Sequence, residues 1–331
     1  MQFPALKFTL VQSEQPCALC GSHDAFVVGT KDRDGQPLRT VISDKSGLVW
    51  TDPRPSSREI DAFYAQLYRL SYKGADAWKP KAKHIYRSGR GARARYELWK
   101  NFLAPCRDTL DVGASAGEMV YLLKGLGKNA RGIEPNESYV EWAKRELAVD
   151  MQAATWKNAT FPEASFDAIT SFHVVEHLED PLGAMRRMAG WLRVGGVAVI
   201  EVPNVAGTCD NPLRRFHFAH LYNFNEATMQ MLGRKAGLEV AASAVTPDTA
   251  ALTVVFRKPE VPTPELGGEI PGNCARIMSV LMDYTFCRHV FAPLTWRRFA
   301  RKHIRSVGEK IAEKRHGSGR ALLDAAIDSH P

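Results

Sequence analysis

The sequence predicts an α/β fold in which strands and helices alternate to build a doubly wound, mostly parallel sheet. A short apolar strand at 108–112 stops at a glycine-containing turn, 113–117, and gives way to a helical pattern. A second apolar strand at 130–133 ends in Glu134, 23 residues after Asp111. Together these features form one nucleotide-binding unit, because glycines let the backbone approach a ligand and the acid accepts hydrogen bonds from a ribose.

The first 55 residues are predicted to form a small antiparallel β module. Cys17 and Cys20 have the Cys-x-x-Cys spacing with which two thiolates at one tight turn of a zinc ribbon bind the metal. The second turn of such a ribbon carries Ser43 and Ser46 here, and neutral hydroxyls are poor zinc ligands. We therefore predict a module without metal, in which Cys17 and Cys20 are only weak ligand candidates.

Residues 56–100 are predicted to be helical and strongly basic, with aromatic residues among the lysines and arginines. The aromatic residues are Tyr64, Tyr68, Tyr72, Trp78 and Tyr86. Such a segment is most often a solvated helix face whose aromatic side chains turn to the core. Interleaved aromatic and cationic side chains also suit nucleic acid, so both interpretations stay open.

The core continues in the same alternating pattern. Further strands are predicted at 167–171, 197–202, 237–244 and 251–257. The last two strands have no helix between them, so they are predicted to pair as an antiparallel hairpin at an edge of the sheet. A stretch rich in proline and glycine after Pro259 reads as an extended linker.

Residues 274–315 are predicted to form amphipathic helices. Apolar residues recur there at helical spacing, and positive charge gathers beside Trp296, Phe299 and Ile304. Such helices either pack on the core, which is the commoner arrangement, or lie on an anionic membrane surface. Peripheral contact of 274–315 with the inner face of a membrane is therefore the alternative to packing.

Length and composition set the broad class. The 331 residues, 45% of them hydrophobic, suffice for one large α/β core with two extensions. The net charge of +8 favours anionic partners, such as phosphorylated metabolites, although a modest basic excess also serves solubility. The six scattered cysteines, the lack of a signal sequence before Cys17 and the absence of an apolar run of ~18 residues predict a cytoplasmic protein.

Two stretches carry a resemblance to a known family. Residues 160–181, which include Ser171-Phe-His-Val-Val-Glu-His, and residues 192–204 resemble the fourth-strand motif and the fifth-strand hairpin of class I S-adenosylmethionine-dependent methyltransferases. The resemblance covers roughly 102–258 and is greatest to the branch with ubiquinone-type, sugar and small-molecule methyltransferases. It implies a Rossmann-like, seven-stranded sheet whose seventh strand is inserted antiparallel beside the fifth. The implied organisation is a β module at 1–55, a basic helical cap at 56–100, a cofactor-binding core at 101–259, and a linker with amphipathic helices at 260–331.

The resemblance also implies S-adenosylmethionine as the cofactor. The implied contacts are Asp111, Gly113, Ala114, Ser115, Gly117, Glu134, Pro135, Trp156 and His173. Ser115 replaces the middle glycine of the family's turn, but it is small enough to fit and able to donate a hydrogen bond. No acidic residue stands where many relatives hold the adenine amino group, so Trp156 is predicted to flank the adenine instead.

Methyl transfer to a hydroxyl group needs an aligned acceptor and a nearby base. Three histidines are candidates: His173 after the fourth strand, and His217 and His220 in the segment after the fifth, where the family inserts substrate contacts. His220 is the leading candidate for the base, with Glu176 and His177 as supporting residues.

Arg214, Arg215 and Tyr222 are predicted to bind the acceptor, since paired arginines can hold a carboxylate or phosphate bidentately. The predicted function is O-methylation of a small-molecule, sugar or glycolipid acceptor, with an anionic acceptor as one option. An RNA methyltransferase is an alternative, but Ser171-Phe-His-Val replaces the Asn-Pro-Pro-Tyr-type signature of base N-methyltransferases. A non-catalytic binding protein is a second alternative, against which the intact cofactor motif argues. The oligomeric state stays open.

Overall fold

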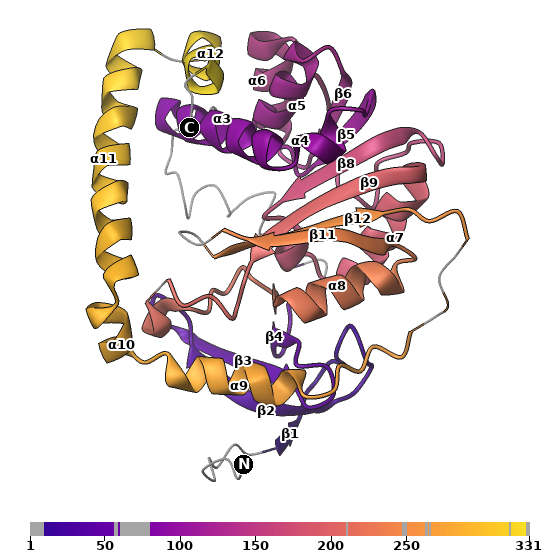
Figure 1. The fold of residues 1–331 in the computed structure, drawn as a ribbon, viewed down its shortest axis with the longest axis vertical. Helices are drawn as coiled ribbons and strands as arrows, with labels where there is room; N and C mark the ends of the chain where they lie inside the picture. The colour runs from indigo at the N-terminus through magenta and orange to yellow at the C-terminus, as the bar shows by residue number, and fades with distance from the viewer. Residues whose placement is uncertain are drawn as a thin grey trace.

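The computed structural model describes residues 10–55, 59, 80–209, 211–246, 250–261, 264, 266–317 and 319–328 (Figure 1). The described residues form a seven-stranded sheet and a five-stranded sheet, with helices around them. Tyr64, Tyr68, Tyr72 and Trp78 of the predicted helical cap lie outside the described residues.

The seven-stranded sheet has the order β11-β12-β9-β8-β5-β6-β7. Its strands are β5 (Asp108–Val112), β6 (Asn129–Glu134), β7 (Asp150–Ala153), β8 (Phe166–Phe172), β9 (Leu192–Pro203), β11 (Glu239–Val245) and β12 (Ala251–Arg257). Strands β5 to β9 are parallel, whereas β12 is antiparallel to both of its neighbours, β9 and the edge strand β11. The predicted Rossmann-like sheet is confirmed. Strand β7 was missed, because only Met151 of its four residues is buried and it has no apolar run.

Helices cover both faces of this sheet because its strands alternate their side chains between two hydrophobic clusters. In β9, Val199 packs with the helices of one face and Ile200 with those of the other. One face carries α3 (Ala82–Leu98), α5 (Glu118–Gly125) and α6 (Glu137–Leu147), and the other carries α7 (Pro181–Trp191) and α8 (Glu226–Lys235). Local signals start two of these helices: Asn136 caps α6, and Asn225 forms a capping box with Thr228 in α8.

The five-stranded sheet joins the N-terminal module to the core. Its strands are β1 (Leu10–Gln12), β2 (Asp24–Lys31), β3 (Pro37–Ser43), β4 (Val49–Thr51) and β10 (Tyr222–Asn223), in that order. The last strand comes from the segment after β9, and Tyr222 pairs with Trp50 of β4. Trp50 is fully buried in the same hydrophobic cluster as Ile200 of the large sheet. The module and the segment that carries His217 and His220 are therefore one packed unit.

The two turns of the zinc-ribbon-like module face each other. The Sγ atom of Cys17 lies 3.2 Å from Oγ of Ser46, and Sγ of Cys20 lies 3.3 Å from Oγ of Ser43. Hydrogen bonds from Cys17 and Ser43 lower the pKa of Cys20, because they stabilise its thiolate. Hydrogen bonding thus links the four positions at which a zinc ribbon would place ligands. That the module holds no zinc stays a prediction.

The C-terminal helices take different positions around the core. They are α9 (Asn273–Asp283), α10 (Phe286–Phe291), α11 (Pro293–His316) and α12 (Arg320–Asp328). Helix α9 buries Cys274 and Ile277 against Ile42 and Val49 of the small sheet, and α12 packs on α3. Helix α11 runs as a long upright element along the left edge of Figure 1. Within the described part of the chain, no helix is both long and apolar enough to cross a membrane.

Candidate functional site

A strained turn connects β5 to α5 at the carboxyl end of the sheet. The backbone φ is +76° at Gly113, +51° at Ser115 and +83° at Gly117. A Cβ atom on Gly113 would lie 2.3 Å from Cγ2 of Val174, so a glycine is required where the turn passes the loop after β8. Ser115 adopts the left-handed conformation in place of the family's middle glycine.

Glu134 lies beside this turn at the end of β6. Its Oε2 atom accepts a hydrogen bond of 3.0 Å from the Ser115 amide, and its Oε1 atom accepts one of 3.1 Å from the Asn136 amide. These bonds fix the carboxylate between the two loops that follow β5 and β6. The structure thus brings Glu134 and the glycine turn together.

Asp111 has a different environment from Glu134. It is buried, and its Oδ1 atom accepts a hydrogen bond of 2.6 Å from Thr170 of the neighbouring strand β8. Burial raises the pKa of Asp111 to about 7, because its charged form is poorly solvated. In this position Asp111 links β5 to β8.

The remaining predicted cofactor residues differ in how far they are buried. Ala114 is buried, and its amide donates to the carbonyl of Ile133 in β6. Pro135 is exposed in the loop that Glu134 begins. Trp156 is half-buried in the loop between β7 and β8, with the ammonium group of Lys157 5.8 Å from its ring centre. Its contact with an adenine ring stays a prediction.

Helix α3 reaches the glycine turn through a residue that sequence reasoning missed. The Nε2 atom of His84 lies 3.1 Å from Oγ of Ser115 and 3.6 Å from Oε1 of the buried Glu118. His84 lies 31 positions before Ser115, within the predicted helical cap at 56–100, where lysines and arginines are the most frequent polar residues. No spacing rule connects these two positions, so only the packing of α3 on the core reveals the contact.

His173 is held between two buried carboxylates. It follows β8 in a left-handed conformation with φ of +57°. Its Nε2 atom lies 3.1 Å from Oε1 of Glu201, and its Nδ1 atom lies 3.5 Å from Oε1 of Glu176. Arg95 of α3 also donates to Glu201, with a Nε to Oε1 distance of 2.9 Å. Glu201 thus ties the cap helix to the loop after β8, a role that sequence reasoning did not assign.

These contacts set the charges of His173 and Glu201. Burial opposes a charged imidazole, but the hydrogen bonds to Glu176 and Glu201 raise the pKa of His173 to about 9. Burial likewise opposes a charged carboxylate, but His173 and Arg95 lower the pKa of Glu201 to about 2. Near neutral pH, His173 is therefore protonated and Glu201 ionised.

We expect the thermal stability of the protein to fall as pH rises towards alkaline values. Because the folded-state pKa of His173 is raised from 6.5 to about 9, its ion pairs stabilise the fold fully below pH 6.5, and this contribution is lost as pH rises through 9. In His173→Asn the fall in melting temperature over this window should be smaller, since asparagine does not titrate and tolerates the left-handed conformation. Calorimetric melting across this range measures both slopes. Equal slopes in the two proteins would contradict the assignment.

His177, His217 and His220 gather behind His173. The rings of His177 and His220 are 4.9 Å apart, and those of His217 and His220 are 5.2 Å apart, between centroids. The Nδ1 atom of His177 lies 2.6 Å from the Ala219 carbonyl oxygen, which it can contact only as a donor. Burial lowers the pKa of His217 to about 4 and that of His220 to about 3, so both are neutral near pH 7. The structure thus brings together the histidines that the sequence places after β8 and after β9.

One group among these side chains has ligand atoms arranged as in a metal site. Ligand atoms of Glu176, His177 and His220 lie within 4.8 Å of one another in the described structure. The hydrogen bond at Nδ1 of His177 leaves Nε2 as the ligand atom, which is how proteins orient metal-binding histidines. One carboxylate and two imidazoles could hold a divalent cation. The Nε2 atom of His177 also lies 3.6 Å from Oε1 of Glu176, which makes an ion pair only when His177 is protonated.

The three residues predicted to bind the acceptor have other contacts here. Arg214 is exposed, and its Nη2 atom lies 3.4 Å from Oδ1 of Asp34 in the N-terminal module. The guanidinium group of Arg215 lies 5.9 Å from the ring centre of Tyr284. Tyr222 is buried in β10, and its hydroxyl donates to the carbonyl of Glu179. Burial raises the pKa of Tyr222 to about 12. These contacts lie near the interface between the N-terminal β module and the core.

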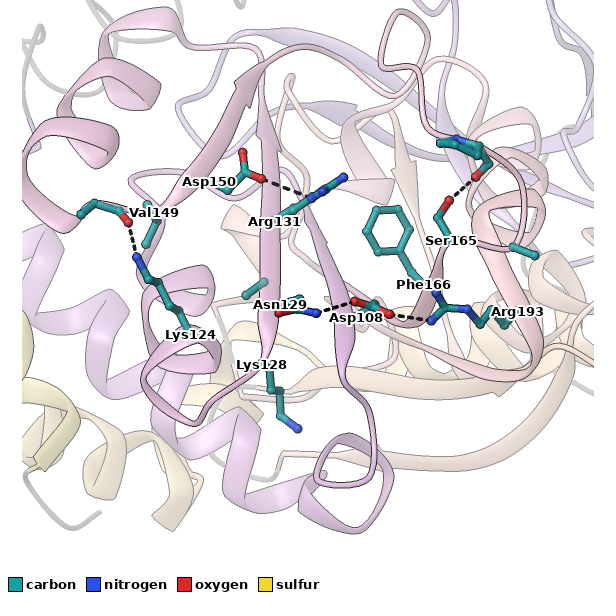
Figure 2. Close-up of a pocket in the computed structure, with 14 residues that line it drawn as sticks. Asp108, Lys124, Lys128, Asn129, Arg131, Val149, Asp150, Ser165, Phe166 and Arg193 are labelled. Carbon is teal, nitrogen blue, oxygen red and sulfur yellow. Dashed lines mark hydrogen bonds and ion pairs between the residues drawn. The ribbon is translucent and has the colours of Figure 1, made fainter.

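An open cavity of about 850 Å³ lies at the other end of the sheet (Figure 2). It is lined by the amino ends of β5 and β6, including Asp108 and Asn129. Its arginines are paired internally: Arg131 with Asp150 at 3.2 Å, and Arg193 with Asp108 at 3.0 Å. Ligands of doubly wound folds bind at the carboxyl ends of the strands, so this cavity is separate from the candidate site.

Comparison with known proteins identifies the core. Residues 83–243 match the model of a methyltransferase domain family. An S-adenosylmethionine-dependent methyltransferase of Mycolicibacterium smegmatis is 30% identical over 40% of this chain, and a ubiquinone biosynthesis O-methyltransferase of Bradyrhizobium diazoefficiens is 28% identical over 44%. The chain spans 52% of the first relative's length and 63% of the second's.

Among solved structures, the chain is similar to a Burkholderia thailandensis 1,6-didemethyltoxoflavin-N1-methyltransferase with bound S-adenosylhomocysteine. The TM-score is 0.47 at 20% identity, with 66% of this chain and 98% of the other covered. The family match, the sequence relatives and the strand order of the large sheet together identify residues 83–243 as a methyltransferase domain of the class I S-adenosylmethionine-dependent type.

Proposed function

We propose that this protein transfers a methyl group from S-adenosylmethionine to a hydroxyl group of a small-molecule, sugar or glycolipid acceptor. The contact between Gly113 and Val174 carries the proposal, because it places the cofactor turn directly against the loop that begins with His173. A cofactor on that turn and an acceptor near the histidines would share one edge of the sheet. The relatives named as ubiquinone biosynthesis O-methyltransferases support oxygen as the methylated atom.

In this proposal the cofactor binds along the turn 113–117 with its ribose on Glu134. Glu134 already accepts two amide hydrogen bonds, so its oxygens are oriented before a ligand arrives. Bound S-adenosylmethionine would supply an activated methyl group. His84 would close the site from α3 through its contact with Ser115.

His220 is the proposed base. It is neutral near pH 7, so an imidazole lone pair is available for the proton of the acceptor. The low pKa makes His220 a weak base, but the arriving proton would lie within 4.8 Å of a Glu176 carboxylate oxygen and of a ring nitrogen of His177. His173 is protonated and would contribute positive charge beside the acceptor. His217 is the second candidate, with a pKa of about 4.

The names of the relatives support the proposed acceptor class more than the contacts of Arg214 and Arg215 do. The guanidinium group of Arg214 is engaged with Asp34, so an anionic acceptor would have to compete with that ion pair. We therefore favour a neutral hydroxylated acceptor over an anionic one. The described residues offer no observation that favours RNA methylation or a non-catalytic binding role.

Incubation of the full chain with methyl-labelled S-adenosylmethionine and catechols, glycosides or glycolipids tests the proposal. We expect an O-methylated product and one equivalent of S-adenosylhomocysteine. With His220 as the base, kcat/KM should stay level from roughly pH 8 down to pH 5, because the free-enzyme pKa of the base lies below that range. A rate that grows steadily up to pH 9 would assign the base to His173 instead. Failure to bind S-adenosylhomocysteine in calorimetry would contradict the proposed function as a whole.

A further inference from the structure

Within the part of the chain that the structure describes, helix α11 has one face that packs on the protein and an opposite face with exposed side chains. On the inner face, Glu309 is 1% exposed and accepts hydrogen bonds of 2.8 and 3.0 Å from Arg87 of α3. Lys83 of α3 adds an ion pair to the same carboxylate at 3.3 Å, and Ala312 is also buried. These contacts hold α11 on the cap helix and fix which side of α11 faces outwards.

The outer face of α11 carries large apolar side chains in solvent. Their exposed fractions are 61% for Trp296, 58% for Phe299, 72% for Ile304, 56% for Val307 and 59% for Ile311. At 3.6 residues per turn the five positions fall on one broad face of the helix, about half a turn away from Glu309 and Ala312. A continuous exposed apolar stripe of this kind marks an interaction surface.

Charge indicates what covers this stripe. Helix α11 contains eight lysines and arginines against two glutamates, of which Glu309 is already paired. Lys310 and Lys314 are exposed beside the apolar residues. A second copy of the same helix would bring like charges together, whereas an anionic lipid surface would accept the apolar stripe and attract the cations around it. Long lysine side chains can lie along the apolar surface and keep their charge at the lipid headgroups.

We propose that the outer face of α11 docks on an anionic membrane surface, with Phe299, Ile304 and Ile311 inserted at the level of the headgroups. The inference does not depend on the proposed reaction, because docking is measured by binding alone. Docking would keep α3, which contributes His84 and Arg95 to the candidate site, next to the membrane.

Co-sedimentation of the full chain with vesicles at low salt tests the proposal. We expect binding to phosphatidylcholine vesicles with about a third phosphatidylglycerol to exceed binding to pure phosphatidylcholine vesicles by tenfold or more, since each basic residue near an anionic surface adds attraction. Phe299→Gln/Ile304→Gln/Ile311→Gln should abolish this binding. Glutamine is a good helix former, so the helix itself should persist.

The matched control replaces three exposed apolar residues elsewhere, Leu98, Leu126 and Val194, whose exposed fractions are 55%, 42% and 59%. Leu98→Gln/Leu126→Gln/Val194→Gln should bind anionic vesicles like the wild type. Circular dichroism and S-adenosylhomocysteine affinity report whether each variant is folded. If the α11 variant unfolds, Lys310→Gln/Lys314→Gln serves in its place and should weaken the preference for anionic vesicles.

Three results would overturn the proposal. The first is equal wild-type binding to neutral and anionic vesicles, or none to either. The second is unchanged binding of the folded α11 variants. The third is a concentration-dependent dimer in analytical ultracentrifugation that the α11 variant dissolves, because the stripe would then be covered by a second copy of the chain.

Discussion

Replacing His220 by alanine is expected to lower turnover by roughly 10²-fold to 10⁴-fold, the usual contribution of a general base. Affinity for S-adenosylmethionine should stay nearly unchanged, because the base acts on the acceptor in the transition state and not on the cofactor. Turnover should recover in part at high pH, where the acceptor hydroxyl ionises without help. Steady-state rates of methyl transfer, together with calorimetric affinity for S-adenosylhomocysteine, measure both effects.

His217→Gln is the matched control, since His217 lies in the same segment and its pKa is also lowered by burial. If His217→Gln loses as much turnover as His220→Ala while cofactor affinity is kept, the base cannot be assigned to His220. If cofactor affinity collapses together with the rate of His220→Ala, His220 supports the shape of the site. Near-normal turnover of His220→Ala would make it a packing residue and leave His217 or His173 to test.

Replacing Glu134 by alanine is expected to weaken S-adenosylmethionine binding by about 1 to 3 kcal/mol, the cost of losing charge-assisted hydrogen bonds. The same change removes the acceptor for the Ser115 and Asn136 amides, so the turn would also lose part of its support. Isothermal titration calorimetry with S-adenosylhomocysteine measures the affinity directly.

Glu134→Gln separates these two effects. Glutamine keeps a carbonyl oxygen for one amide but loses the negative charge and one acceptor oxygen. We expect an intermediate affinity for this variant. Unchanged affinity in Glu134→Ala, with the fold intact, would remove Glu134 from the cofactor site.

The sequence by itself determined most of the large sheet and the glycine turn that lies beside Glu134. The turn at 113–117 and the strand that ends in Glu134 are local patterns, because the residues that define each of them lie close together along the chain. The same holds for the antiparallel pairing of β11 with β12, for which the lack of a helix between these two strands is the signal. Strand β7 was not predicted, because three of its four residues are exposed and it has no apolar run.

Only the tertiary structure decided the contacts between distant segments. His84 meets Ser115, Arg95 meets Glu201 across 106 positions, and β10 pairs with β4 of the N-terminal module. Such contacts arise where packed elements converge, and no periodicity or spacing along the chain specifies them. The charge of His173 depends on Glu201 for the same reason, because a pKa follows from burial and from neighbours in space. Likewise, the sequence showed that residues 293–316 are amphipathic, but the clamp between Glu309 and Arg87 decides which face of α11 turns away from the protein.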